Sequence, residues 1–249
     1  MNAISDDSMA GRVAGIRARI AAACARAGRD PAQVALLPVS KTFGEPAILE
    51  ALELGLRRFG ENKVQELRGK AESPGLAGRG IDWVMIGHLQ TNKARDVARL
   101  AAEVQSLDRL ELAQALDRRL QQEGRAIDVL VQVKTSDEPS KYGAPPDELP
   151  ALLRGLARMD TLRVRGLMTL AVHTDDPARV RACFRLLRTL RDRARDEHAG
   201  GLDLGRLSMG MSGDFEIAVE EGSTEVRIGT AIFGARAYGD SYYWPEAPR

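Results

Sequence analysis

Lys41 directly follows an apolar run, residues 34–40, whose composition predicts a buried strand. An ammonium group at the end of such a strand costs free energy unless it is paired, coordinated or neutralised. Burial also shifts the pKa of lysine readily, which turns the amine into a nucleophile towards carbonyl compounds. Lys41 is therefore a candidate for imine chemistry, and the alternative is a side chain that simply reaches solvent.

Two loops rich in glycine and hydroxyl groups follow the last two predicted strands. Residues 208–213 have the sequence SMGMSG and lead into a predicted helix, and Gly229-Thr230 closes the last strand before a predicted turn at 232–234. Glycine lets a ligand approach the backbone, where free N–H groups and hydroxyls donate to phosphate oxygens. Ordinary turn glycines with Ser212 as a helix cap are the alternative. Phosphate binding is favoured because both loops occupy the positions where parallel barrels commonly bind phosphate.

An imine-forming lysine and a phosphate cradle together suit pyridoxal 5'-phosphate, which carries an aldehyde at one end and a phosphate at the other. Arg227 lies close to the phosphate loops in sequence, and its guanidinium is a candidate to face the ring nitrogen of that cofactor. An arginine partner would leave the nitrogen largely unprotonated and weaken the ring as an electron sink. A salt bridge between Arg227 and a neighbouring acid is the equally simple alternative.

The elements that must position these residues alternate between strand and helix along the whole chain. Strands are predicted at 34–40, 57–60, 83–86, 104–107, 127–133, 162–168, 206–209 and 226–229, and helices at 9–28, 46–54, 63–71, 92–100, 109–123, 147–157, 177–195 and 215–221. This order predicts the α/β class and a single (β/α)8 barrel of the triosephosphate-isomerase type, with an open doubly wound sheet as the runner-up. The domain is predicted to span residues 1–249, with its barrel at about 34–235 and an extra N-terminal helix.

Composition narrows the class of protein further. The 249 residues are 44% hydrophobic and 29% charged, and the net charge of +1 and the 4% of aromatic residues argue against nucleic-acid binding. No apolar run approaches the roughly 20 residues that a membrane helix needs, and the N-terminus lacks a signal-peptide pattern. Cys24 and Cys183 are too few and too far apart for a disulfide framework or a zinc motif. We therefore expect a cytoplasmic protein without membrane contact.

At this point the sequence closely resembles the family of pyridoxal phosphate homeostasis proteins. The resemblance rests on six segments in order: VSKT at 39–42, FGENKVQE at 59–66, IGHLQTNK at 86–93, RGLMT at 165–169, LSMGMS at 207–212 and VRIGTAIFG at 226–234. It implies a barrel related to the N-terminal domain of alanine racemase. Three positions depart from the family pattern, namely Val84, Lys134 and Phe215, where a histidine, an asparagine and a methionine are more usual, and they touch only the surroundings of the expected site.

The resemblance also implies roles for individual residues. Lys41 would form the internal aldimine with pyridoxal 5'-phosphate, Asn62 would lie beside the cofactor, and Arg227 would face the pyridine nitrogen. Ser208, Gly229 and Thr230 would hold the phosphate, and Met209 would be a further cofactor-binding residue. Lys141 matches a loop lysine associated with cofactor exchange.

The function implied is that of a carrier or regulator of cellular vitamin B6 without established catalysis, which binds the cofactor, exchanges it with cofactor-dependent apoenzymes and is a monomer. A cofactor-dependent amino-acid racemase of fold type III is the first alternative, and it needs a second acid or base opposite the imine. Tyr238, Tyr242, Tyr243 or a partner subunit would have to supply that group, since only about 20 residues follow the last strand. A Schiff-base aldolase acting on a phosphorylated sugar is the second alternative.

The remaining polar features have simpler interpretations. His88 is a candidate for the rim of the pocket but more ordinarily a structural loop residue, and His198 is expected on the surface. His173 with Asp175 and Asp176 suggests a metal site less than a solvated turn, so no metal is expected. The arginine-rich helix at 179–195 carries interspersed acids, which favours a solvated face over a binding patch.

Overall fold

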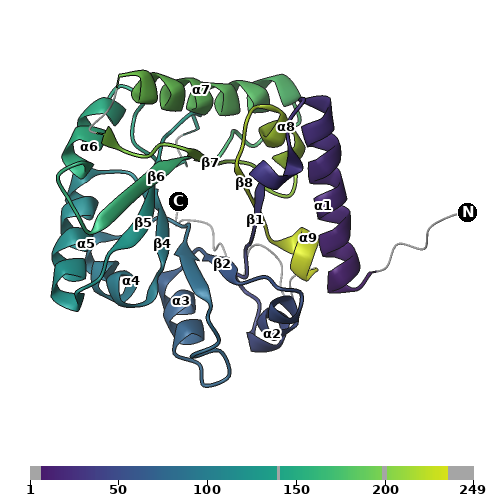
Figure 1. Ribbon diagram of the computed structural model, residues 1–249, viewed down its shortest axis with the longest axis horizontal. Helices are drawn as coiled ribbons and strands as arrows, with labels where there is room; N and C mark the ends of the chain where they lie inside the picture. Colours follow the sequence, from purple (N-terminus) through teal and green to yellow (C-terminus); the bar gives the residue numbers. More distant parts are fainter. Residues whose placement is uncertain (1–6, 139–140, 198–200, 235–249) are drawn as a thin grey trace, which may run out of the picture.

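The computed structural model describes residues 7–138, 141–197 and 201–234, which form a parallel sheet surrounded by helices (Figure 1). The strands are β1 (Ala35–Pro38), β2 (Arg58–Glu61), β3 (Asp82–Met85), β4 (Glu103–Leu107), β5 (Ile127–Gln132), β6 (Leu162–Met168), β7 (Arg206–Ser208) and β8 (Glu225–Ile228). The α-helices are α1 (Met9–Arg26), α2 (Glu45–Glu53), α3 (Val64–Ala71), α4 (Ala94–Leu100), α5 (Leu110–Glu123), α6 (Leu149–Leu156), α7 (Pro177–Asp196), α8 (Phe215–Glu220) and α9 (Thr230–Phe233). Two 3₁₀ turns, Pro31–Gln33 and Thr91–Lys93, complete the described elements.

The sheet closes into a barrel. Its strand order is β1-β8-β7-β6-β5-β4-β3-β2, and every pair is parallel. The two ends of this order meet where Val39 forms a parallel bridge with Gly60 and the Ser40 N–H donates to the Gly60 carbonyl at 3.1 Å. The predicted eight-stranded barrel is therefore confirmed, and the open doubly wound sheet is wrong.

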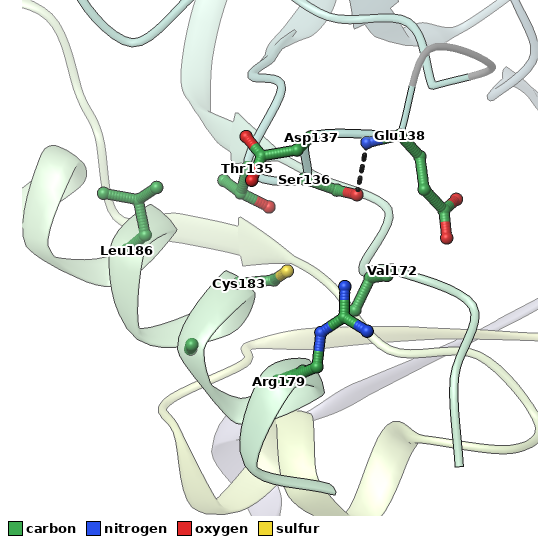
Figure 2. Close-up of a pocket in the computed structure, with 9 residues that line it drawn as sticks. Thr135, Ser136, Asp137, Glu138, Val172, Arg179, Cys183 and Leu186 are labelled. Carbon is green, nitrogen blue, oxygen red and sulfur yellow. Dashed lines mark hydrogen bonds between the residues drawn. The ribbon is translucent and has the colours of Figure 1, made fainter. Parts of the chain in front are cut away.

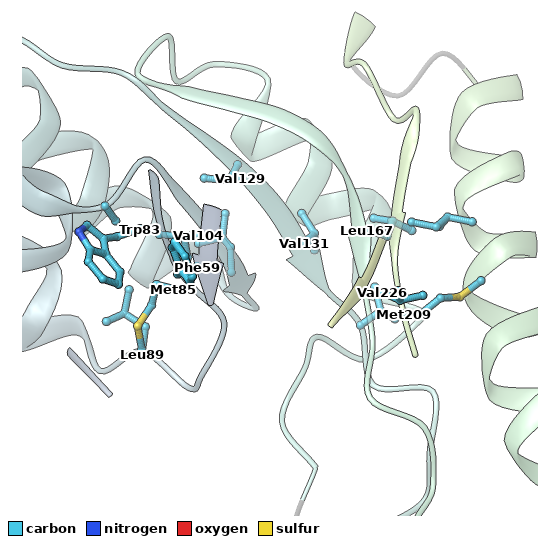
Figure 3. Close-up of a cluster of buried hydrophobic side chains, with 14 of the residues drawn as sticks. Phe59, Trp83, Met85, Leu89, Val104, Val129, Val131, Leu167, Met209 and Val226 are labelled. Atoms are coloured by element: carbon cyan, nitrogen blue, oxygen red, sulfur yellow. The ribbon is translucent and has the colours of Figure 1, made fainter. Parts of the chain in front are cut away.

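The apolar core fills the space between the strands and the surrounding helices. Figure 3 shows part of it, where Phe59 and Trp83 from neighbouring strands approach with ring centroids 6.0 Å apart, above Leu89. Burying a side chain of this size contributes roughly 1.5–3 kcal/mol to folding. The core thus anchors β2 and β3, whose carboxyl ends carry the polar residues of the barrel mouth.

The extra N-terminal helix is present and packs on the outside of the barrel against α8 and α9 (Figure 1). Its buried residues recur at helical spacing: Met9, Val13, Ile16, Ile20, Ala23 and Cys24. Arg19 adds an ion pair with Glu216 at 3.1 Å, and its guanidinium lies 4.6 Å from the centre of the Phe215 ring. The departure from the family pattern at Phe215 therefore contributes to the seam between α1 and α8.

One predicted element needs correction. Residues 230–233 form the short helix α9 rather than a turn, and Gly234 ends it with a φ of 90°. The helix predicted at 147–157 lies at Leu149–Leu156, within two residues of both predicted ends, and Pro150 fits its first turn, where the missing N–H has no partner in any case. The other elements agree with their predicted ranges within two residues, the usual uncertainty of helix and strand ends.

The arginine-rich helix α7 is more than a solvated face. Arg181 pairs with Glu220 at 2.6 Å and with Glu221 at 2.8 Å, and Arg185 and Arg188 also pair with Glu221. These carboxylates lie at the end of α8, far away in sequence, whereas two acids in and directly after α7 pair with arginines of the same helix, Asp192 with Arg191 and Glu197 with Arg193. The arginines fasten α7 to α8.

Both cysteines, Cys24 and Cys183, are buried and free, in agreement with the expectation of no disulfide framework. Among the described ranges, no helix combines the length and the apolar character required to cross a membrane.

Candidate functional site

Lys41 follows β1 in a backbone segment that α3 holds on both sides. The Nζ of Lys70 donates to the Ser40 carbonyl at 2.7 Å, and the Thr42 N–H donates to the Glu66 carboxylate at 2.7 Å. Thr42 itself has a φ of 69°, a left-handed conformation that a β-branched residue rarely adopts. Such strain, of order 1–3 kcal/mol, persists only where the surroundings impose it. We call this arrangement around residues 40–42 the lysine clamp.

A buried carboxylate, that of Glu61, also supports the lysine clamp. Glu61, the last residue of β2, is fully buried and accepts hydrogen bonds from the Ser40 hydroxyl at 2.5 Å and from Lys70 at 2.6 Å. Burial raises the pKa of Glu61, although Lys70 and Ser40 act in the opposite direction. Within the described residues the second carboxylate oxygen of Glu61 and the Thr42 hydroxyl have no hydrogen-bond partner. Two buried polar atoms of the lysine clamp, one on Thr42 and one on Glu61, are therefore left for a ligand or water to satisfy.

Asn62 is positioned by the end of β3. A Cβ at Gly87 would lie 2.8 Å from both the Cα and the carbonyl carbon of Asn62, and closer still to its carbonyl oxygen. Glycine at position 87 is thus the condition for the backbone of Asn62 to occupy its place. The partly buried Asn62 follows Glu61 at the carboxyl end of β2, on the side of the barrel where Lys41 follows β1.

Arg227 lies inside the barrel, with only 3% of its surface exposed. Its guanidinium donates to the Ser208 hydroxyl at 2.8 Å and to the Thr169 carbonyl at 2.7 Å. Burial lowers the pKa of Arg227 to about 10, an effect that Glu225 and Asp214 oppose, so the side chain remains charged at neutral pH. Within the described ranges it forms no direct ion pair, which removes the support for the salt-bridge alternative.

Ser208 and Met209 face away from the surface. The Ser208 hydroxyl is fully buried and donates to the side-chain oxygen of Gln105 at 2.7 Å, and Met209 belongs to the apolar cluster drawn in Figure 3. Their side chains are therefore occupied in the interior. Ser212 of the same loop is partly buried, and the alternative that it caps the helix is wrong, because the N-cap residue of α8 is Asp214.

The loop after β7 is shaped by Gly210, which has a φ of 97°. A Cβ there would lie 2.6 Å from the Ala218 Cβ and 2.9 Å from the Phe215 Cα, so the loop is pressed onto α8. The Met211 N–H donates to the Asp214 carboxylate at 2.5 Å. Burial raises the pKa of Asp214, while this hydrogen bond, Arg227 and Lys141 act to lower it.

Gly229 and Thr230 lie next to this loop, at the end of β8. A Cβ at Gly229 would meet only Val39, its carbonyl at 3.4 Å and its Cβ at 3.7 Å, both ordinary contact distances, so the strand end is not crowded. Thr230 is exposed and begins α9, where the first N–H groups of a helix have no intrahelical acceptor. The two loops identified in the sequence are neighbours, since the Arg227 N–H of β8 donates to the Gly210 carbonyl at 2.9 Å.

The segment containing Lys141 approaches the barrel mouth from another side. Lys141 pairs with Glu138 at 3.4 Å, and the Gln132 amide donates to the Tyr142 carbonyl at 2.8 Å. The Tyr142 ring stacks on His88 with centroids 4.0 Å apart. His88 thus holds the Lys141 segment against the loop after β3, a connection between distant loops that no motif in the sequence signals.

A side pocket of about 260 Å³ lies between residues 135–138 and α7 (Figure 2). Its lining includes Arg179 and Cys183 on the helix and Asp137 on the loop. The Thr135 hydroxyl, also in the lining, is 2.9 Å from that of Thr169, whose carbonyl holds Arg227. The pocket therefore adjoins the wall of the candidate site and does not contain its main residues.

The metal-site candidates and the tyrosine candidates gain no support among the described residues. The described residues contain no group of three or more potential metal ligands, so the arrangement of His173, Asp175 and Asp176 gives no support for a metal site there. Asp176 instead caps α7 by accepting from the Ala178 N–H at 2.9 Å. The remaining candidates, Tyr238, Tyr242, Tyr243 and His198, lie outside the described residues.

Comparisons with known proteins agree with this geometry. Residues 12–237 match the family described as "Alanine racemase, N-terminal domain". A pyridoxal phosphate homeostasis protein of Pseudomonas aeruginosa is 45% identical over 232 residues, which cover 93% of this chain and 97% of the relative. PipY of Synechococcus elongatus is 36% identical, with 91% of this chain and 100% of PipY covered, and its structures without and with bound PLP give TM-scores of 0.82 and 0.79. An alanine racemase of Streptomyces coelicolor shares the fold at 17% identity, with a TM-score of 0.68 over 90% of this chain and 58% of the racemase.

Proposed function

This chain belongs to the family of pyridoxal phosphate homeostasis proteins, and from that premise we propose that it binds pyridoxal 5'-phosphate covalently through the Nζ of Lys41. The observation that carries the proposal is the register of β1 against β8, in which Leu37 pairs with Arg227 and Pro38 with Ile228. Lys41 consequently emerges at the same end of the barrel as Gly229 and Thr230. An amine, a buried guanidinium and a donor-rich loop then lie along one wall of the barrel mouth.

The residues present fit the chemistry of that cofactor. When bound, pyridoxal phosphate supplies an electrophilic aldehyde, a ring nitrogen and a phosphate. Lys41 provides the amine, and the charged Arg227 is a donor for the ring nitrogen. The Thr42 hydroxyl, unpartnered among the described atoms, is a further donor on the residue that follows Lys41.

For the phosphate we propose the amides and hydroxyls at the ends of β7 and β8, with Gly229 and Thr230 as the main contributors. Ser208 and Met209 contribute through packing, because their side chains lie in the interior and the Met209 N–H already donates to the Glu225 carbonyl at 3.1 Å. Ser212, partly buried in the loop after β7, offers a further hydroxyl. Asn62, held in place by Gly87, lines the opposite side of the cofactor.

We further propose that the protein carries and releases the cofactor rather than using it in turnover. The name of the Pseudomonas aeruginosa relative, a homeostasis protein, supports this view. A monomer that hands pyridoxal phosphate to apoenzymes through the Lys141 segment is the corresponding mode of action. That segment is held to the mouth by the stacking of Tyr142 on His88 and by the hydrogen bond from the Gln132 amide.

The test is the absorption spectrum of the purified protein after incubation with pyridoxal phosphate, followed by borohydride reduction and peptide mass mapping. We expect a visible band and a cofactor mass on Lys41, both lost in Lys41→Ala. Lys63→Ala, which changes an exposed lysine directly before α3, should leave both unchanged. A colourless wild-type protein with no fixed mass would exclude the proposal.

Catalysis is tested separately with the loaded wild-type protein and alanine. Racemisation at ordinary enzymatic rates would replace the carrier by the racemase alternative, and cleavage of a phosphorylated sugar by a cofactor-free chain would favour the aldolase. We expect neither activity.

A further inference from the structure

The amino end of the barrel is filled with charge rather than with apolar side chains. Arg58 pairs with Glu103 at 2.9 Å and with Glu225 at 2.6 Å, and Arg206 pairs with the same two carboxylates at 2.7 and 2.9 Å. These four residues begin β2, β4, β7 and β8, so their contacts can form only inside the barrel. We call them the basal charge cluster.

Because strand side chains alternate between faces, residues two positions further along these strands also point inward. On β4 and β7 they are Gln105 and Ser208, and on β8 the residue is Arg227. All three have 3% or less of their surface exposed. The interior therefore contains a continuous polar column that leads from the basal charge cluster towards the barrel mouth.

Hydrogen bonds connect this column end to end. The Gln105 amide nitrogen donates to Glu103 at 2.6 Å and also to Glu225, while its oxygen accepts from the Ser208 hydroxyl at 2.7 Å. Arg227 donates to the oxygen of the same hydroxyl at 2.8 Å. Gln105 is the only residue of the described column that touches both the basal carboxylates and Ser208.

The direction of every bond in the column follows from the carboxylates. Ionised Glu103 and Glu225 only accept, so Gln105 must turn its NH₂ group towards them and its oxygen towards Ser208. Ser208 has a single hydroxyl proton, which it donates to the Gln105 oxygen. Only the lone pairs of the Ser208 hydroxyl therefore remain to accept from Arg227. The basal carboxylates thus determine that the Arg227 guanidinium meets the Ser208 hydroxyl as an acceptor.

We propose that Gln105 is a positioning residue for the cofactor site, which acts through Ser208 to hold the Arg227 guanidinium in one plane with its remaining N–H groups aimed at the mouth. The inference rests on the proposed function, because it takes Arg227 to face the cofactor ring. Asp214 and Lys141 are the other charged groups that act on this region, from the loop after β7 and from the Lys141 segment.

The test compares Gln105→Leu, Ser208→Ala and the double variant. Leucine keeps much of the volume of the glutamine side chain but removes the acceptor of the Ser208 hydroxyl. The hydroxyl can then rotate and turn its proton towards the Arg227 guanidinium, which is itself a donor. The loss of one such bond predicts about five- to tenfold weaker cofactor binding, with Lys41 still labelled by borohydride. The wavelength of the bound-cofactor band and its dependence on pH should also change, whereas lost packing alone would leave both in place.

A double-mutant cycle gives a readout that needs no cofactor. The effects of the two substitutions on the urea unfolding of the cofactor-free protein should be strongly non-additive, because both break the same chain of hydrogen bonds. Ser106→Ala is the matched control, since Ser106 neighbours Gln105 on β4 and its buried hydroxyl has no partner among the described residues. It should change neither the spectrum nor the binding.

Three results distinguish the possibilities. Folded Gln105→Leu and Ser208→Ala variants whose band, pH profile and affinity match the wild type would overturn the role of Gln105 while leaving the proposed function intact. Additive unfolding effects of the two substitutions would do the same. A wild-type protein that takes up no pyridoxal phosphate would overturn both proposals together.

Discussion

Replacing Gly87 by alanine should damage the site through Asn62 without touching Lys41. The new Cβ would lie 2.8 Å from two carbon atoms of the Asn62 backbone, whereas real Cβ atoms essentially never come within 3.0 Å of another heavy atom. The clash is with backbone, so no side chain can rotate away, and the loops after β2 and β3 must separate. Overpacking of this kind costs about 1–3 kcal/mol of stability.

The same displacement should weaken cofactor binding, because a shift of about 1 Å in a positioned group can cost up to 10²-fold in function. We expect at least a tenfold higher Kd for pyridoxal phosphate in Gly87→Ala, measured by absorbance titration, together with a lower urea midpoint. The borohydride label should remain on Lys41. These outcomes follow from the position of one methyl group.

Gly69→Ala is the matched control, because Gly69 lies within α3 and a Cβ there would meet nothing within 4 Å. Alanine in a helix should raise stability by about 0.5–1 kcal/mol and leave the Kd unchanged. A Gly87→Ala protein with the stability and Kd of the wild type would refute the assignment of Gly87 as the residue that positions Asn62.

Three further predictions concern other parts of the molecule. Lys70→Met should remove the hydrogen bond to the Ser40 carbonyl and so loosen the backbone around Lys41. We expect the uptake of pyridoxal phosphate, measured by stopped-flow absorbance, to slow severalfold. Unchanged kinetics would contradict the role of the lysine clamp. Burial opposes the ionisation of Glu225, but Arg58 and Arg206 outweigh it and hold its pKa below the ordinary value. Its contribution to stability is therefore present above the unfolded pKa of about 4.3 and is lost as the pH falls through the folded pKa, so urea midpoints should fall between about pH 4.5 and 3, and less so in Glu225→Gln. Burial raises the pKa of the fully buried Cys24 thiol, so a thiol reagent at pH 8 should label it only on unfolding, and rapid labelling of the native protein would show that α1 detaches.

Local patterns in the sequence determined the elements and their order. Apolar runs of strand length, helical spacing in the stretches between them and well-placed glycine and proline residues all depend on neighbours within about ten positions. The strand-end rule for parallel barrels then located Lys41, Asn62, Gly229 and Thr230 at one end of the molecule, before any contact was known. Barrel closure was only favoured by the number of strands, and the bridge between Val39 and Gly60 decided it.

The partners of charged and hydroxylic side chains were decided by the tertiary structure. Arg181 lies in a helix with acids of its own but pairs with Glu220 and Glu221 of α8, and Ser208, expected at the phosphate, turns inward to Gln105 on β4. The reason is geometric. Closing the sheet brings the inward faces of strands about 100 residues apart into hydrogen-bonding distance, and no periodicity along the chain records which of those faces will meet.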